Sequence, residues 1–319
     1  MSIIERVADL LVPGGRSEPD QTSPSQVPAN SGLDAVERVA GQDPLGIEPS
    51  ENQGLVARHK ADDPFPPRSG IAGGIDKRIR SLKVDRELLH QQKLILPDEK
   101  RTPIAEAFRR VKRQILSNLA QLKPGTHPNL VMVTSSAPGE GKSFCATNLA
   151  LSIALEMDHM VVLVDGDVAR PSIPKMFGFE ADRGLMDVLL DRRVHLSDVL
   201  FRTDIGKLML LPAGTQHRQA TEVLSSGMMH TVLKELSEQD PNRIIVFDSP
   251  PIMAASEAAI LAGQMGQVVV VVEAGKTTEM LLKAALARIE SSNVVGLILN
   301  RGQSVSLLDG YGEYGYDAS

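Results

Sequence analysis

The chain has 319 residues, of which 42% are hydrophobic and 3% are aromatic, and its formal net charge at pH 7 is -6. This length and apolar content are sufficient for one large α/β domain with additional segments. The acidic balance argues against a generally basic nucleic-acid-binding surface, and no apolar run reaches the roughly 18 residues that a membrane-spanning helix needs. Cys145 is the single cysteine, which excludes an intramolecular disulfide; we expect it to be a small core residue in a reducing cytoplasm.

The N-terminal part of the chain predicts a short helix followed by a long linker. Residues 1–12 place apolar side chains on one helical face, which favours an amphipathic helix that docks on a protein partner; a frayed terminus is an equally good interpretation. Residues 13–70 contain nine of the twenty prolines, many small polar residues and a single aromatic, Phe65. This composition cannot bury enough surface to offset the entropy of ordering, so we predict a disordered, flexible linker.

A helical lead-in is predicted for residues 71–125. Between Ile71 and Leu96, spaced apolar residues suggest a first amphipathic helix. A second helix begins at Pro103, and its apolar face consists of Ile104, Phe108, Val111 and Ile115. The opposite face consists of Glu106, Arg109, Lys112 and Arg113. This polar face is either a solvated surface with an intrahelical Glu–Arg pair or a contact between copies of the chain.

The most informative stretch runs from Val131 to Ser143, where an apolar, β-prone run leads through a glycine-containing turn into a helical pattern. It fits the phosphate-binding loop GxxxxGK[ST], except that Ser136 replaces the first glycine. Lys142 would reach the β- and γ-phosphates, and Ser143 would offer its hydroxyl to Mg²⁺. An ordinary strand–turn–helix is the alternative. The residues expected to bind the nucleotide are Ala137, Pro138, Gly139, Glu140, Gly141, Lys142, Ser143 and Phe144.

Carboxylates follow two of the apolar runs downstream. Asp165 and Asp167 follow Met160–Val164, and Asp248 follows Ile244–Phe247. Open α/β sheets bind ligands at the carboxyl ends of their strands, so we expect these side chains beside the loop, with Asp248 on Mg²⁺ directly or through water.

Apolar runs and helical stretches alternate through residues 126–303. The further candidates for buried strands are Leu208–Leu211, Val268–Val272 and Val294–Leu299. The helical candidates are Phe144–Glu156, Thr221–Glu238 and Thr278–Glu290. This alternation predicts an α/β P-loop NTPase domain, with a mostly parallel sheet and helices on both faces, preceded by the flexible N-terminal segment.

Residues 304–319 form a Gly-rich, acidic tail. It contains all three tyrosines of the protein, Tyr311, Tyr314 and Tyr316. Such clustering in a segment without apolar periodicity is not core packing, so it indicates a functional role for the tyrosines themselves.

These motifs together resemble the bacterial tyrosine kinase family, in particular the exosortase-associated exopolysaccharide tyrosine autokinases. Ser136–Ser143 resembles the family's Walker A motif, Val161–Arg170 its second aspartate-bearing motif, and Ile245–Pro250 its Walker B motif. The tyrosine-rich tail matches as well. The resemblance extends from about Ile75 to Ser319.

The second predicted helix resembles the family's E-x-x-R-x-x-R oligomerisation motif. Glu106 and Arg109 match it, whereas Lys112 replaces the second arginine. Lysine lacks the planar fork of arginine, so a bidentate contact is not expected at this position.

The resemblance implies an ATP-dependent protein-tyrosine kinase that uses Mg²⁺ and phosphorylates the tyrosines of its own tail. The implied catalytic residues are Lys142, Asp165, Asp167 and Asp248. Asp165 is the candidate for accepting the tyrosine proton. The implied Mg²⁺ ligands are Ser143, Asp167 and Asp248.

Two further residues are implied to bind the nucleotide. Arg170 belongs to the second aspartate-bearing motif, and Asn300 ends the last predicted strand. Asn300 resembles a contact to the adenine edge; a turn residue is the alternative.

The resemblance also implies partners and a place in the cell. We expect regulation of exopolysaccharide synthesis, export and chain length by a ring-like homo-oligomer. It would be cytoplasmic and peripheral at the inner membrane, through a membrane-embedded polysaccharide chain-length determinant protein. A cognate tyrosine phosphatase is a further expected partner, and nucleic acid is not.

Two other functions fit parts of the sequence. A deviant Walker ATPase of the partitioning or division-site type would use the same fold as a nucleotide switch, but such proteins carry a signature lysine where this chain has Ala137. A catalytically weak scaffold protein of a polysaccharide assembly would use ATP only to hold an oligomer. The intact set of Lys142, Ser143, Asp165 and Asp248 argues against the scaffold.

Overall fold

The computed structural model describes residues 79–97, 102–119, 127–240, 242–289 and 295–302. The expected docking helix at residues 1–12, the linker at 13–70 and the tail at 304–319 with its three tyrosines lie outside the described residues. In the part that is described, no helix combines the length and the apolar character needed to cross a membrane.

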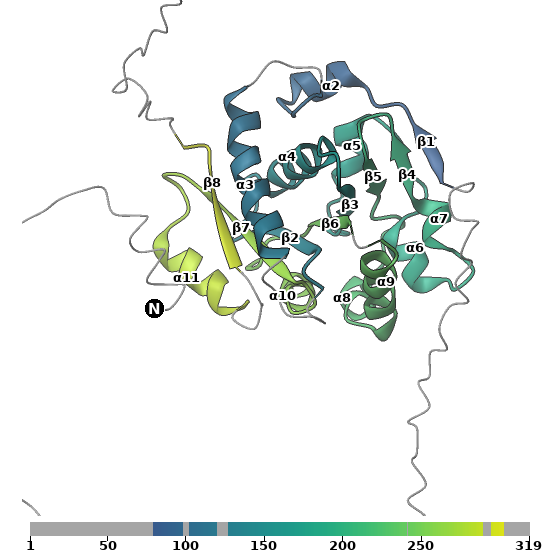
Figure 1. Cartoon of the computed structure of the whole chain (residues 1–319). Helices are drawn as coiled ribbons and strands as arrows, with labels where there is room; N and C mark the ends of the chain where they lie inside the picture. The colour runs from purple at the N-terminus through teal and green to yellow at the C-terminus, as the bar shows by residue number, and fades with distance from the viewer. Residues whose placement is uncertain (1–78, 98–101, 120–126, 241, 290–294, 303–319) are drawn as a thin grey trace, which may run out of the picture. The chain divides into compact units, whose positions relative to one another are not determined.

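An eight-stranded sheet organises the described structure (Figure 1). In spatial order its strands are β1 (Arg80–Leu82), β4 (Phe201–Thr203), β5 (Leu208–Leu211), β3 (Met160–Asp165), β6 (Arg243–Asp248), β2 (Leu130–Ser135), β7 (Gln267–Glu273) and β8 (Val295–Asn300). Neighbouring strands run parallel, except that β4 and β5 pair antiparallel. The five strands in the middle of the sheet are buried on both faces, which is why their sequences are continuous apolar runs.

Helices cover both faces of the sheet (Figure 1). The helices on one face are α2 (Arg86–Gln91), α3 (Pro103–Leu119), α4 (Lys142–Ala154) and α5 (Ile173–Phe177). Those on the other face are α6 (Leu185–Leu190), α7 (Leu196–Val199), α8 (Ala220–Leu224), α9 (Gly227–Glu238), α10 (Ser256–Ala262) and α11 (Glu279–Ala287). The predicted α/β class, the mostly parallel sheet and the helices on both faces are confirmed.

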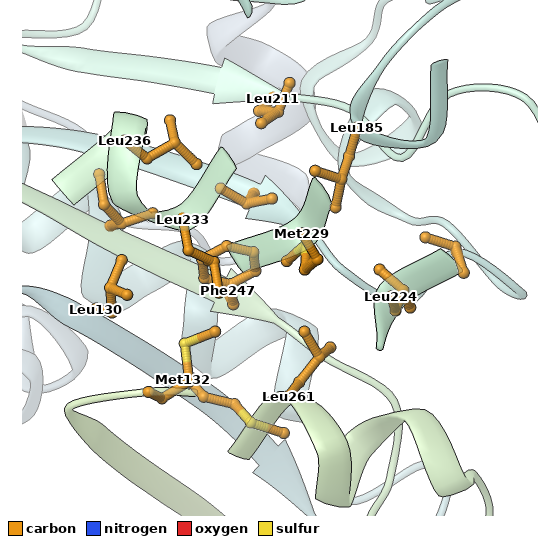
Figure 2. Close-up of a cluster of buried hydrophobic side chains, with 14 of the residues drawn as sticks. Leu130, Met132, Leu185, Leu211, Leu224, Met229, Leu233, Leu236, Phe247 and Leu261 are labelled. Atoms are coloured by element: carbon orange, nitrogen blue, oxygen red, sulfur yellow. The ribbon is translucent and has the colours of Figure 1, made fainter. Parts of the chain in front are cut away.

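Each layer of helices closes a hydrophobic core against the sheet. Figure 2 shows the core beneath α8, α9 and α10, where Met229 and Leu233 of α9 lie beside Phe247 of β6. The second core lies around α4, which is buried from Cys145 to Ala154 because the sheet and α3 both pack against it. Burial raises the pKa of the Cys145 thiol to about 12, so this cysteine is a core residue, as expected.

Within the described residues, the helix expected over Ile71–Leu96 is confirmed only in part. Arg80–Leu82 forms the edge strand β1, paired with β4, and only Arg86–Gln91 is helical. Ile79, just before β1, packs against one core, whereas Leu82 of β1 and Leu89 of α2 both pack into the other core.

Two other element predictions need correction. The single helix expected over Thr221–Glu238 is two helices, α8 and α9, because the hydroxyls of Ser225 and Ser226 bond to backbone carbonyls of the preceding turn. The strand expected to be buried at Val294–Leu299 is the edge strand β8, described from Val295 onward, in which Leu299 is 61% exposed.

The sequence pattern placed Lys112 on a polar face that is either solvated or a contact between copies, but its side chain instead packs within its own chain. Its side chain is buried, and Nζ donates to the carbonyl oxygen of Ser152 at 3.1 Å and pairs with Glu156. Ser152 lies in the last turn of α4, where the helix dipole favours a positive charge, and Glu156 follows the end of the helix. The expected pair of Glu106 and Arg109 is present on α3, and both residues are half-buried.

Candidate nucleotide and catalytic site

The phosphate loop joins the end of β2 at Ser135 to the start of α4 at Lys142. Gly139, at φ 86°, and Gly141, at φ 96°, adopt the left-handed conformation that other residues rarely tolerate. A Cβ atom at Gly141 would also lie 2.1 Å from Nδ2 of Asn300. The loop therefore requires glycine at Gly141 for both backbone conformation and space.

The loop presents a series of free backbone donors. Within the described residues, the N–H groups of Gly139–Ser143 have no hydrogen-bond acceptor, whereas that of Ala137 donates to Oε2 of Glu140 at 2.8 Å. The free groups lead directly into the N-terminus of α4, whose dipole adds positive partial charge. This arrangement is suited to an anion such as the phosphate chain of a nucleotide.

Lys142 meets two carboxylates beside the loop. Its Nζ lies 2.8 Å from Oδ2 of Asp167, 3.4 Å from Oδ1 of Asp248 and 3.3 Å from Oγ of Ser143. Burial alone would lower the pKa of Lys142, but the charges of Asp248 and Asp167 outweigh burial, so the pKa lies above its ordinary value. The lysine is therefore a fixed positive charge at neutral pH.

Asp165 is held in one orientation and keeps one oxygen free. The parallel pairing of β3 with β6 places it opposite Asp248. Its Oδ2 accepts the N–H groups of Ser172 at 2.8 Å and Ile173 at 2.9 Å, while its buried Oδ1 has no partner among the described residues. Burial, followed by the charge of Asp248, raises the pKa of Asp165 to about 7. The carboxyl group thus combines a fixed geometry with an open acceptor position.

The residues present fit a magnesium nucleotide. Across the described ranges, no group of three or more His, Cys, Asp or Glu side chains is arranged to hold a metal ion. Mg²⁺ does not need such a cage, because it is commonly bound through one or two carboxylates together with the phosphates of the nucleotide. Asp167, Asp248 and Ser143 supply two carboxylates and a hydroxyl next to the phosphate loop.

The remaining predicted site residues, Arg170, Phe144 and Asn300, differ in what they contact. Arg170 is exposed, and its backbone N–H bonds to Asp167. The ring of Phe144 packs edge-on against Phe108 of α3, with 6.4 Å between ring centroids. Asn300 donates from Nδ2 to the carbonyl oxygen of Glu140 at 2.9 Å, which ties it to the loop.

Two residues that support the site, Ser172 and Thr277, were missed by sequence reasoning. Ser172 orients Asp165 and donates from Oγ to Asp248 at 3.3 Å; its place before a proline-containing helix start is an N-cap signature that could have drawn attention to it. Thr277 donates to Glu140. Oγ of Ser136, at the position of the first Walker A glycine, is buried without a partner in the described structure.

Comparison with known proteins agrees with this geometry. Residues 127–306, more than half of the chain, match the ParA family model described as "NUBPL iron-transfer P-loop NTPase". The fold and the site thus define a P-loop NTPase of the ParA type. Among relatives, tyrosine-protein kinase YwqD of Bacillus subtilis is 31% identical over 238 residues, which are 74% of this chain and 96% of YwqD. The chain therefore belongs to the bacterial tyrosine kinase family.

Two further relatives define the extent of the likeness. Tyrosine-protein kinase ptk of Acinetobacter johnsonii is 31% identical over 174 residues, which are 54% of this chain but only 23% of that longer protein. The crystal structure of the chimerical protein CapA2B2 superposes with a TM-score of 0.58 at 26% identity, covering 70% of this chain and 94% of that one. The chain thus spans less than a quarter of ptk and nearly all of YwqD.

Proposed function

We propose that the protein is an ATP-dependent tyrosine autokinase that phosphorylates Tyr311, Tyr314 and Tyr316 in trans. One observation carries the proposal: a charged lysine, two carboxylates and a third carboxyl group with a free oxygen converge beside the phosphate loop. Membership of the bacterial tyrosine kinase family supports the same reaction.

Each group has a defined part in phosphoryl transfer. MgATP supplies the transferable γ-phosphoryl group, with Ser143, Asp167 and Asp248 as the residues that would hold the ion. Lys142 offsets negative charge on the β- and γ-phosphates, and the free N–H groups of Gly139–Ser143 bind the phosphate oxygens. The tyrosine oxygen bonds to the γ-phosphorus, ADP leaves, and the phenolic proton passes to Oδ1 of Asp165.

Transfer between copies requires self-association. The half-exposed pair of Glu106 and Arg109 on α3 is the proposed contact, within a ring-like homo-oligomer. Lys112 of the same motif is bonded to α4 of its own chain, which leaves the contact to the other two residues. Close neighbours raise the effective concentration of each tail at the next active site.

Phosphorylation in trans would also limit itself. Each phosphate adds about -1.5 to -2 charge, next to Asp309, Glu313 and Asp317 in the sequence. A phosphorylated tail is repelled by the carboxylates of the site, so the oligomer weakens as the tail is filled.

The proposed biological setting is regulation of exopolysaccharide synthesis, export and chain length. The expected partners are a membrane-embedded chain-length determinant protein and a cognate tyrosine phosphatase, with the kinase cytoplasmic and peripheral at the inner membrane.

The decisive experiment is mass spectrometry of phosphotyrosine after incubation of the purified protein with and without MgATP. A mixture of a Lys142→Met variant and a variant whose three tail tyrosines are Phe then tests transfer in trans, because neither can phosphorylate a tail alone. Phosphotyrosine on the Lys142→Met chains is the expected result, and its absence would exclude transfer between copies.

Self-association has its own test. Arg109→Glu should give monomers in light scattering, whereas Lys234→Glu, an exposed position of α9 on the other face of the sheet, should keep the mass of the wild type. Equal masses for all three proteins would assign Glu106 and Arg109 to a solvated surface.

The match to the ParA model favours one alternative function, a nucleotide switch of the deviant Walker type. Such a protein would consume ATP without forming phosphotyrosine. Ala137 stands where that class has its signature lysine, and a tyrosine-rich tail has no part in such a switch. ATP hydrolysis without phosphotyrosine in the incubation above would favour this alternative.

A further inference from the structure

The phosphate loop is held by a hydrogen-bond network that the proposed chemistry does not use. At its centre is Glu140, which is only 2% exposed. Oε2 of Glu140 accepts the N–H of Ala137 at 2.8 Å, and Oε1 accepts the hydroxyl of Thr277. The backbone carbonyl of Glu140 accepts from Nδ2 of Asn300 at 2.9 Å. We refer to Glu140, Thr277 and Asn300 as the loop support.

The two outer members of the loop support are themselves fixed by the ends of strands. Thr277 follows β7, and its Oγ1 accepts the N–H of Glu273 at 2.9 Å, which directs the single hydroxyl proton to Glu140. Asn300 ends β8, where it is in register with Glu273, and its Oδ1 accepts the N–H of Arg301 at 2.9 Å. The side chain of Arg301 pairs in turn with Glu273 at 2.7 Å. The loop support is therefore anchored to the rigid sheet.

We infer that Glu140 is a positioning residue, which keeps the backbone donors of Gly139–Ser143 in place for the phosphates of the nucleotide. This inference deepens the proposed function and rests on its nucleotide site. Donors that are fixed before binding lose little freedom when the phosphates arrive, so the affinity is higher than for a loop that must first be ordered. A carboxyl group this close to an anion site opposes phosphate binding by its charge, and both of its oxygens are occupied within the protein. Its contribution is therefore the shape of the loop.

The sharpest variant is Thr277→Val, which retains the size and branching of the side chain and removes the hydroxyl. Thr277→Ser is the matched control, because it restores the hydroxyl without the methyl group. For the full chain titrated with MgADP in a calorimeter, Thr277→Val should weaken binding by about tenfold or more, because it removes the hydrogen bond to the charged Glu140 and also the acceptor of the Glu273 N–H. Thr277→Ser should bind MgADP like the wild type. Rates of phosphotyrosine formation at saturating MgATP should be equal in all three proteins.

Glu140→Gln gives a second, independent measurement. Its carbonyl oxygen can still accept from Ala137, but its NH₂ group donates and cannot accept the hydroxyl of Thr277. We expect weakened MgADP binding by the folded protein, together with a lower melting temperature in the absence of nucleotide because a buried hydrogen bond is lost. A purely structural role would lower the melting temperature and leave the affinity of the folded fraction unchanged.

The outcomes separate this inference from the proposed function. If the wild type binds MgADP and forms phosphotyrosine, but Thr277→Val and Glu140→Gln bind MgADP equally well, the positioning role is wrong and the kinase stands. A variant that loses rate at saturating MgATP with unchanged affinity also overturns the positioning role. A wild type that binds no MgADP overturns both.

Discussion

The phosphate loop has two sides that differ in chemistry. On the catalytic side, Lys142 faces Asp167 and Asp248, and each partner carries a charge that the reaction can use. On the opposite side of the loop, the loop support of Glu140, Thr277 and Asn300 makes hydrogen bonds only within the protein. We therefore expect the catalytic side to govern the rate of phosphoryl transfer and the loop support to govern how tightly the nucleotide is bound. Variants on the two sides should separate these quantities.

The largest effect is expected for Lys142→Met. No other described side chain places a positive charge between Asp167 and Asp248, so phosphotyrosine formation should fall by about 10³-fold or more. The measurement is phosphotyrosine by mass spectrometry at saturating MgATP. A melting curve recorded with Mg²⁺ is the control for folding, because removal of the lysine leaves two buried carboxylates without their partner. Full activity in the folded variant would remove the catalytic side from the mechanism.

Asp165→Asn should give the next largest effect on rate. The amide keeps the shape of the carboxyl group and can still accept the N–H groups of Ser172 and Ile173, but it cannot take up the tyrosine proton. Loss of a general base typically reduces the rate by about 10²- to 10⁴-fold. Single-turnover measurements at saturating MgATP should show this loss with unchanged MgADP affinity. A variant that instead binds MgADP weakly would make Asp165 part of the nucleotide site.

Sequence reasoning predicted the catalytic side well because its residues belong to local motifs. The apolar runs before Asp165 and Asp248 identified two strands, and the rule that ligands bind at strand carboxyl ends brought both aspartates to the loop. The central strands were equally clear, since burial on both faces leaves an uninterrupted apolar run. This part of the fold and of the site could be predicted without coordinates.

The loop support could not be predicted in the same way. Thr277 lies 137 positions after Glu140 in the sequence, and Asn300 lies 160 positions after it, so no local spacing connects them. Short edge elements such as β1 were missed for a related reason, because three residues carry too little periodicity to distinguish a strand from a helix. Lys112 was expected on a solvated face or at a contact between copies, because helical spacing alone cannot reveal that its side chain packs on α4 of its own chain. In each case the decisive contact is tertiary.

The pH dependence of stability provides a third test. The ionised form of Asp165, the proposed proton acceptor, should destabilise the folded protein. Its pKa is raised from 3.8 to about 7 by burial and then by Asp248, so the folded protein holds this proton more tightly than the unfolded chain. The resulting stabilisation is complete below pH 3.8 and is lost as the pH rises through about 7. At about 1.4 kcal/mol per pKa unit, the loss amounts to at most about 4 kcal/mol.

Asp165→Asn should therefore be more stable than the wild type at pH 8, and this advantage should disappear at low pH. Urea unfolding at pH 4 and pH 8, in EDTA and without nucleotide, measures the difference. A difference in the free energy of unfolding that is the same at both pH values would show that the carboxyl group does not titrate between them.

The smallest effect is expected at Asn300, where the loop support and the predicted adenine contact make different predictions. Asn300→Ala removes the bond to the carbonyl of Glu140, and a lost neutral hydrogen bond should weaken MgADP binding about fivefold. Magnesium tripolyphosphate, which has no adenine, tells the two roles apart. If Asn300 supports the loop, affinity for tripolyphosphate falls by the same factor as affinity for MgADP, because both ligands use the donors of Gly139–Ser143. If Asn300 instead contacts the adenine edge, only the affinity for MgADP falls. Since Nδ2 already donates to Glu140 and Oδ1 already accepts from Arg301, we expect the parallel loss.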